Sequence, residues 1–77
     1  MPRDIASVVP INSKTVRLYN SKGQTCGDVH ITVYGEIIGS PMISGRICKI
    51  VYREGSNRIV NTYEMPDFRL INRSYLN

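Results

Sequence analysis

Arginine and tyrosine are the side chains of this sequence best suited to binding chemistry. Seven of the ten basic residues are arginine, whose planar guanidinium matches phosphate and carboxylate groups better than an ammonium does. Five tyrosines stand against one phenylalanine, and tyrosine suits interfaces because its apolar ring carries a polar hydroxyl. The net charge of +4 and the pI near 9.4 are compatible with an anionic partner such as nucleic acid, and also with an ordinary solvated surface.

Residues for catalysis or metal binding are few and poorly spaced. His30 is the only histidine, and Cys26 and Cys48 are the only cysteines, with no CxxC pair, so the spacing disfavours a zinc site. On a strand, Cys26 and His30 would share one face at about 13 Å, too far apart for proton transfer. We therefore predict a non-enzymatic protein without metal or cofactor, although a symmetric oligomer could assemble a site at its axis.

No segment of the sequence indicates secretion or membrane insertion. Residues 1–14 carry charge and proline but no apolar core of a signal peptide. No stretch approaches the ~18 apolar residues of a membrane span. The expected location is the cytoplasm, where Cys26 and Cys48 would both be reduced thiols.

Short alternating segments between turn residues predict the fold. The expected strands cover residues 15–20, 26–39, 46–53, 57–64 and 67–74, the last of these being a strand or a single helical turn. The expected turns lie at residues 20–24, 39–42 and 54–57. This spacing predicts an all-β, five-stranded, mainly antiparallel barrel or strongly bent sheet over residues 15–77, after an N-terminal arm of residues 1–14. Its architecture resembles that of the small SH3-like, Sm-like and OB-like barrels.

Alternation assigns side chains to an inner and an outer face. Lys49 is expected outside because lysine is almost never buried without a partner, which turns its neighbours Cys48 and Ile50 inward. The full set expected inside is Val29, Ile31, Val33, Ile37, Cys48, Ile50, Tyr52, Ile59, Asn61 and Tyr63. Three arm residues are candidate anchors against the sheet, namely Val8, Val9 and Ile11.

The outer face mixes basic, aromatic and apolar side chains, and such a patch predicts a contact surface. The residues expected to bind nucleic acid are Arg17, Tyr19, Tyr34, Lys49, Arg53 and Arg58. The residues expected at the interface of a homodimer are Ile47, Val51 and Val60. The first hypothesis is a module that binds single-stranded nucleic acid or RNA by neutralising phosphates and stacking bases. The alternative is a protein-interaction module, such as a small inhibitor or assembly factor, that uses the same face.

Overall fold

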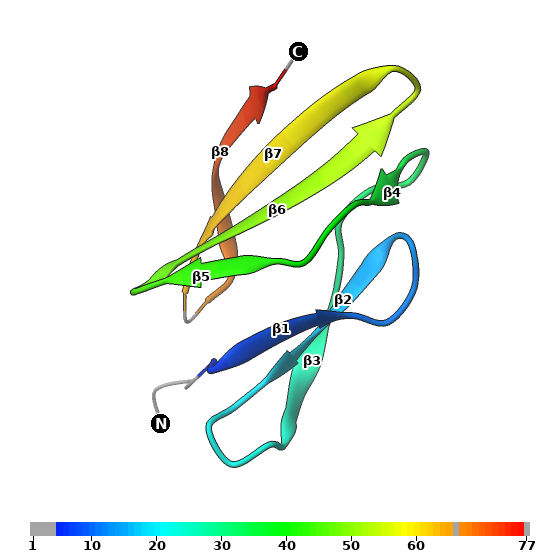
Figure 1. Cartoon of the computed structure of the whole chain (residues 1–77). Helices are drawn as coiled ribbons and strands as arrows, with labels where there is room; N and C mark the ends of the chain where they lie inside the picture. The colour runs from blue at the N-terminus through cyan, green and yellow to red at the C-terminus, as the bar shows by residue number, and fades with distance from the viewer. Residues whose placement is uncertain (1–4, 66, 77) are drawn as a thin grey trace.

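The computed structural model describes residues 5–65 and 67–76, and these contain no helix. Its eight strands are β1 (Ser7–Pro10), β2 (Thr15–Tyr19), β3 (Thr25–His30), β4 (Glu36–Ile37), β5 (Met42–Ser44), β6 (Ile47–Glu54), β7 (Asn57–Glu64) and β8 (Arg69–Tyr75). All pair antiparallel, in a three-stranded sheet β1-β2-β3 and a five-stranded sheet in which β4 and β5 share one edge of β6, followed by β7 and β8 (Figure 1). The predicted all-β, antiparallel, bent-sheet fold is confirmed; the sheets stay open and do not close into a barrel.

The β6–β7 hairpin forms the centre of the larger sheet. Its register runs without interruption from Ile47 opposite Glu64 to Glu54 opposite Asn57. The reversal needs only two residues, and the first, Gly55, has φ of 61°, the positive angle that a tight hairpin turn with glycine in its first position requires. The predicted turn at residues 54–57 is thus confirmed, and it fixes which side chains of both strands face the core.

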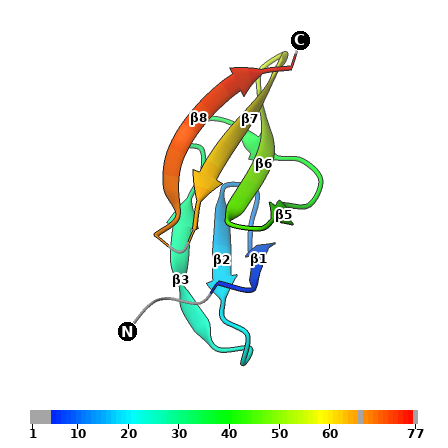
Figure 2. The same cartoon turned by 90° about the vertical axis from the view of Figure 1, so that its left-hand side faces the viewer.

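The two sheets pack through their inner faces into one hydrophobic core. The smaller sheet contributes Val8, Val16 and Leu18, and the larger sheet contributes Cys48, Ile50, Tyr52, Ile59 and Tyr63. Every residue of β6 and β7 that alternation placed inside is buried, and Lys49 is exposed as expected. Buried side chains of both sheets belong to this one core, and the two sheets are seen as separate units, with β1–β3 in the lower part of the view and β6–β8 in the upper part (Figure 2).

The expected strand at residues 26–39 is interrupted where the chain crosses between the sheets. β3 ends at His30 and β4 begins at Glu36. Thr32 is buried at 5% exposure, and its hydroxyl accepts a hydrogen bond from the Gly35 N–H at 3.0 Å, a local bond that competes with strand pairing. The prediction that Val33 faces inward is wrong, because this bend leaves its side chain 62% exposed.

The expected chain reversal at residues 39–42 is also wrong. β4 and β5 both pair antiparallel with β6, so the chain keeps its direction. The Ile38 N–H still donates to the Val51 carbonyl at 3.0 Å, and residues 39–41 bulge away from β6 before β5 begins. Pro41 has no N–H to give to the ladder, which is a usual reason for a bulge at a sheet edge. The reversal comes later, at Gly45, which has φ of 61°.

Both ends of the chain contribute strands. Within the expected arm, β1 pairs with β2, and of the three candidate anchors only Val8 is buried, since Val9 and Ile11 are exposed. Val9 belongs to the opposite face of the same strand, as alternation requires. Residues 69–75 form a strand and not a helical turn.

A fully buried asparagine carries a polar network inside the larger sheet. Asn61 Oδ1 accepts hydrogen bonds from the Tyr52 hydroxyl at 3.3 Å and from Arg73 Nε at 3.0 Å. Its Nδ2 donates to the Tyr63 hydroxyl at 2.9 Å. A buried polar side chain is tolerated when its donors and acceptors have partners, so Asn61 links β6, β7 and β8 and holds Arg73 against the inner face.

Replacing this asparagine should be costly, because the hydroxyl and guanidinium donors would lose a shared acceptor. We expect Asn61→Ala to lower the free energy of unfolding by about 2–4 kcal/mol and Tyr63→Phe by about 1 kcal/mol, both measured by urea denaturation. Thr62→Ala, on the outer face of the same strand, is the control and should stay within about 0.5 kcal/mol of the parent. Equal effects at positions 61 and 62 would contradict the network's role.

Candidate functional site

Six of the predicted functional residues lie together on the outer face of the β6–β7 hairpin. This β6–β7 face consists of Ile47, Lys49, Val51 and Arg53 on β6 with Arg58 and Val60 on β7. Val51 lies directly opposite Val60, and Arg53 lies directly opposite Arg58. The surface is thus an apolar pair next to a pair of guanidinium groups.

The Arg53–Arg58 pair is an unfavourable arrangement that a nearby carboxylate partly offsets. The Leu76 N–H donates to the Arg58 carbonyl at 2.8 Å, so the backbone of Arg58 faces β8, and the Arg53–Arg58 pair is of the closer, non-hydrogen-bonded kind. Like charges directly opposite one another destabilise a sheet. Glu36 on β4 lies on the other side of Arg53, with Oε1 2.7 Å from Nη2. The Glu36 carboxylate therefore offsets part of the repulsion at Arg53.

Tyr34 stands at the end of the β6–β7 face with 90% of its surface exposed. It belongs to the segment that joins the two sheets, and a shallow pocket of about 380 Å³ runs past it. The pocket lining includes Ser13, Lys14, Tyr34, Gly35, Glu36, Arg53 and Gly55. Lys14 Nζ donates to the Gly35 carbonyl at 2.6 Å, which places a second cation, besides Arg53, beside Tyr34.

A second pocket of about 260 Å³ lies on the other side of Tyr34. Its lining is His30, Ile31, Thr32, Val33, Tyr34, Tyr52, Glu54 and Arg73. The His30 ring forms a hydrogen bond with the Thr15 hydroxyl at 3.2 Å. His30 lies only four residues before Tyr34 in the sequence. The cations around Tyr34 that sequence reasoning missed are Lys14 and Arg73, which come from segments distant in the sequence, so no local pattern signals them.

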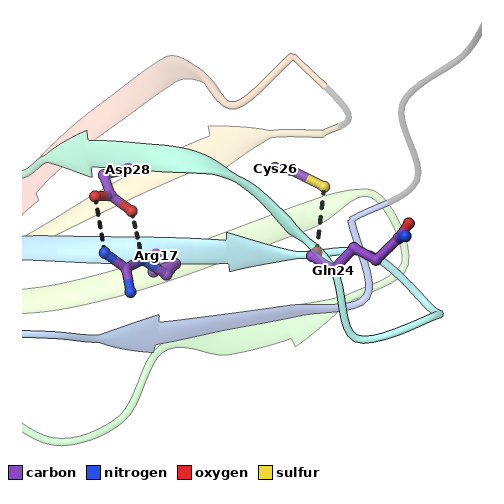
Figure 3. A network of polar contacts seen from close by, with 4 residues as sticks. All are labelled: Arg17, Gln24, Cys26 and Asp28. Carbon is purple, nitrogen blue, oxygen red and sulfur yellow. Dashed lines mark hydrogen bonds and ion pairs between the residues drawn. The ribbon is translucent and has the colours of Figure 1, made fainter.

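Arg17 and Tyr19, two of the predicted nucleic-acid contacts, do not join this site. They lie on the outer face of β2, in the other sheet. Arg17 forms two contacts with Asp28 on β3, at 2.8 Å from Nε and 3.2 Å from Nη2 (Figure 3). The hydrogen bonds and opposite charge raise the pKa of Arg17 and lower the pKa of Asp28. The Arg17 charge is therefore balanced locally.

Lys49 extends the positive surface along β6. It lies four residues from Arg53 on the same face, which is about 13 Å along a strand, and Val51 lies between them. In the described part of the chain, Lys49 has no ion pair. The β6–β7 face thus offers two positive ends around an apolar centre.

The predicted dimer residues are less exposed than other apolar side chains. Ile47, Val51 and Val60 are all of intermediate burial. The large apolar side chains with greater exposure are Val9, Ile11, Val33, Tyr34, Met42, Ile43, Leu70, Ile71, Tyr75 and Leu76. Apart from Val33 and Tyr34, these lie on or next to strands at the edges of the two sheets.

Residues 5–65 and 67–76 contain no group of three or more His, Cys, Asp or Glu side chains placed to hold a metal ion. The same residues include no helix that could traverse a lipid bilayer.

Cys48 is buried in the core, and burial raises the pKa of its thiol from 9.0 to about 11. A thiol with so high a pKa is protonated near neutral pH, which makes it a poor nucleophile.

No protein-family model matches this chain, and no match is found among curated proteins or solved structures. Function is therefore inferred from the chain's own geometry. The arrangement around Tyr34 and the β6–β7 face can stack a planar group and neutralise anions.

The two cysteines should differ in reactivity. In the folded protein at pH 8, a thiol reagent should modify the part-exposed Cys26 and leave Cys48 intact, because Cys48 is buried and its pKa is about 11. After denaturation both should react, as mass spectrometry would show. Rapid modification of Cys48 in the folded protein would contradict this placement.

Gly35 should tolerate no side chain, because a Cβ there would collide with the Arg53 carbonyl and the Glu54 side chain. We expect Gly35→Ala to destabilise the fold by about 1–3 kcal/mol and to shift the amide resonances of Tyr34 and Arg53. Ser13→Ala, in the same pocket, is the control and should do neither. An unchanged spectrum for Gly35→Ala would show that Tyr34 is not positioned by this close approach.

Proposed function

We propose that this chain is a small, non-enzymatic module that binds single-stranded nucleic acid or RNA through Tyr34 and the β6–β7 face. The observation that carries the proposal is a tyrosine with 90% exposure that shares a pocket with Arg53, which itself lies opposite Arg58. Modules of this kind use a basic surface along the backbone and aromatic rings on which bases stack.

The opposed Arg53 and Arg58 side chains favour a bound anionic ligand over a surface that contacts only water. A phosphate beside Arg53 and Arg58 would relieve the repulsion between two opposed guanidinium groups. The Arg53–Glu36 ion pair is exposed on both sides, and exposed pairs contribute only about 0–1 kcal/mol, so a phosphate can compete for Arg53. Lys14 and Lys49 lie to either side of the arginines and would extend the contact.

The alternative is a protein-interaction module that uses the same face. The opposed Val51 and Val60 side chains favour it, because an apolar centre with a charged rim is typical of protein interfaces. Both versions of the proposal include a cytoplasmic location. Two cysteines that are not joined by a disulfide fit that location.

Salt dependence separates the two functions. With phosphate contacts from Lys14, Lys49, Arg53 and Arg58, the logarithm of affinity for a labelled single-stranded 20-mer should fall against log salt with a slope near −3, at about −0.7 per contact. Arg53→Ala should lower both affinity and slope in fluorescence anisotropy. Tyr34→Ala should weaken binding by roughly 5- to 150-fold, the equivalent of 1–3 kcal/mol for one stacked base, and leave the slope unchanged.

Tyr19→Ala is the matched control, since Tyr19 lies on the other sheet and should not affect binding. If the Tyr34→Ala variant binds with the same affinity as the parent, Tyr34 does not stack on a base and that part of the proposal is wrong. Binding weaker than about 100 µM at low salt would reject nucleic acid and favour a protein partner, because even non-specific nucleic-acid binding is usually tighter.

A further inference from the structure

The described sheets have four open edges, and three of them carry features that discourage further strand pairing. β1 is four residues long and ends in Pro10. β3 contains Gly27 at φ of 131°, and its pairing with β2 shifts register. The edge formed by β4 and β5 is broken by the bulge that contains Pro41. Short strands, prolines and bulges are the usual means by which proteins protect sheet edges.

β8 has the fewest such features. Its pairing with β7 shifts register between Thr62 and Tyr63, and it then continues without interruption from Asn72 to Tyr75. It is seven residues long, has neither glycine nor proline, and every one of its residues is exposed. It forms the rim of the larger sheet, with β7 as its only neighbour (Figures 1 and 2). Tyr75 is 64% exposed, and Leu70, Ile71 and Leu76 are also exposed. An exposed, partly apolar edge that is regular over residues 72–75 can serve as a template for another strand.

The open backbone groups of β8 belong to specific residues. The Leu76 N–H donates to the Arg58 carbonyl on β7 at 2.8 Å. Because backbone groups along a strand point alternately to either side, Ser74 also faces β7, whereas Arg73 and Tyr75 direct their N–H and C=O groups to the open edge. An added strand must therefore pair with Arg73 and Tyr75.

We propose that the added strand is β8 of a second copy of this chain, antiparallel and with the two-fold axis at Ser74. In that register Arg73 of each copy lies opposite Tyr75 of the other. The Arg73 Nε donates to Asn61, and the rest of the guanidinium can face the opposite aromatic ring, a favourable cross-strand and cation–π pair. A register centred on Arg73 would oppose two guanidinium groups. A register centred on Tyr75 would overlap the fewest residues. Of the registers centred on Arg73, Ser74 and Tyr75, the one at Ser74 satisfies both backbone and charge.

This dimer leaves the β6–β7 face open. An antiparallel pair of this kind has its two-fold axis perpendicular to the sheet, so both copies present their β6–β7 faces on the same side of one continuous sheet. Leu76 of each copy would lie opposite Asn72 of the other, which covers part of the exposed apolar surface. The proposal does not depend on nucleic-acid binding, since it rests on the open backbone edge of β8; Arg73 is the residue of this edge that also lines the second pocket beside Tyr34.

Cysteine cross-linking tests the register directly. In this register, Ser74 lies opposite Ser74 of the second copy in a non-hydrogen-bonded pair, with a typical Cα separation of about 4.5 Å, within disulfide reach. Ser74→Cys, in a Cys26→Ser background, should form a disulfide-linked dimer on mild oxidation. Asn72→Cys is the matched control: it lies on the same face of the same strand, but about 13 Å from its counterpart, and should not cross-link above background. Equal cross-linking at the two positions, or none at either, would overturn the register.

Sedimentation velocity at micromolar concentration tests the surface itself. Tyr75→Pro removes an N–H that faces the open edge and spares the β7 ladder, so it should weaken the dimer about tenfold or more, with circular dichroism confirming the fold. Val51→Lys, on the β6–β7 face, should leave the dimer unchanged. A parent chain that is monomeric throughout a dilution series would overturn the proposal. So would a dimer that Val51→Lys abolishes and Tyr75→Pro leaves intact.

Discussion

The register of β6 against β7 is the constraint on which the rest of this structure depends. Eight consecutive residue pairs are held in place by a two-residue turn, and a slip of one residue would turn every side chain to the opposite face. The same register that buries Ile50 and Ile59 places Arg53 opposite Arg58 on the outside. The register of β6 against β7 therefore determines both the core and the candidate binding surface, which lie on opposite faces of the same hairpin.

The junction between the sheets determines where Tyr34 stands. Thr32 is buried, donates to Glu54 at 3.1 Å and accepts from the Gly35 N–H, while Gly35 approaches the Arg53 carbonyl too closely for any side chain. These contacts tie the linking segment to the β6 end of the hairpin. The turn between β1 and β2 adds to them, because the Ser13 carbonyl accepts from the Ile37 N–H at 2.6 Å and Lys14 bonds Gly35. The exposed Tyr34 ring thus belongs to a segment whose backbone is fixed by several hydrogen bonds.

The net charge alone does not show where the protein surface is positive, because several arginines form ion pairs with carboxylates. Arg17, Arg53 and Arg69 each lie beside a carboxylate, so much of the basic character is balanced where it occurs. In the described part of the chain, Lys49 has no ion pair, and it lies on the face that also carries Arg53, Arg58, Val51 and Val60. A total charge of +4 would be equally compatible with an even surface; its distribution is what favours an anionic partner at this face.

The sequence by itself determined the strands and faces of the hairpin, because period-two alternation and a glycine turn act between neighbours in the chain. It also determined the all-β class and the exposure of Lys49, Arg53 and Arg58. Only the tertiary structure decided that Val33 faces solvent, that the chain bulges at Pro41 without reversing, and that Arg17 and Tyr19 belong to another sheet. Those outcomes depend on which strand lies beside which, and pairing between distant segments leaves no period in the sequence. The same reason explains why Lys14 and Arg73 were missed beside Tyr34: they meet it only because segments distant in the sequence pack together.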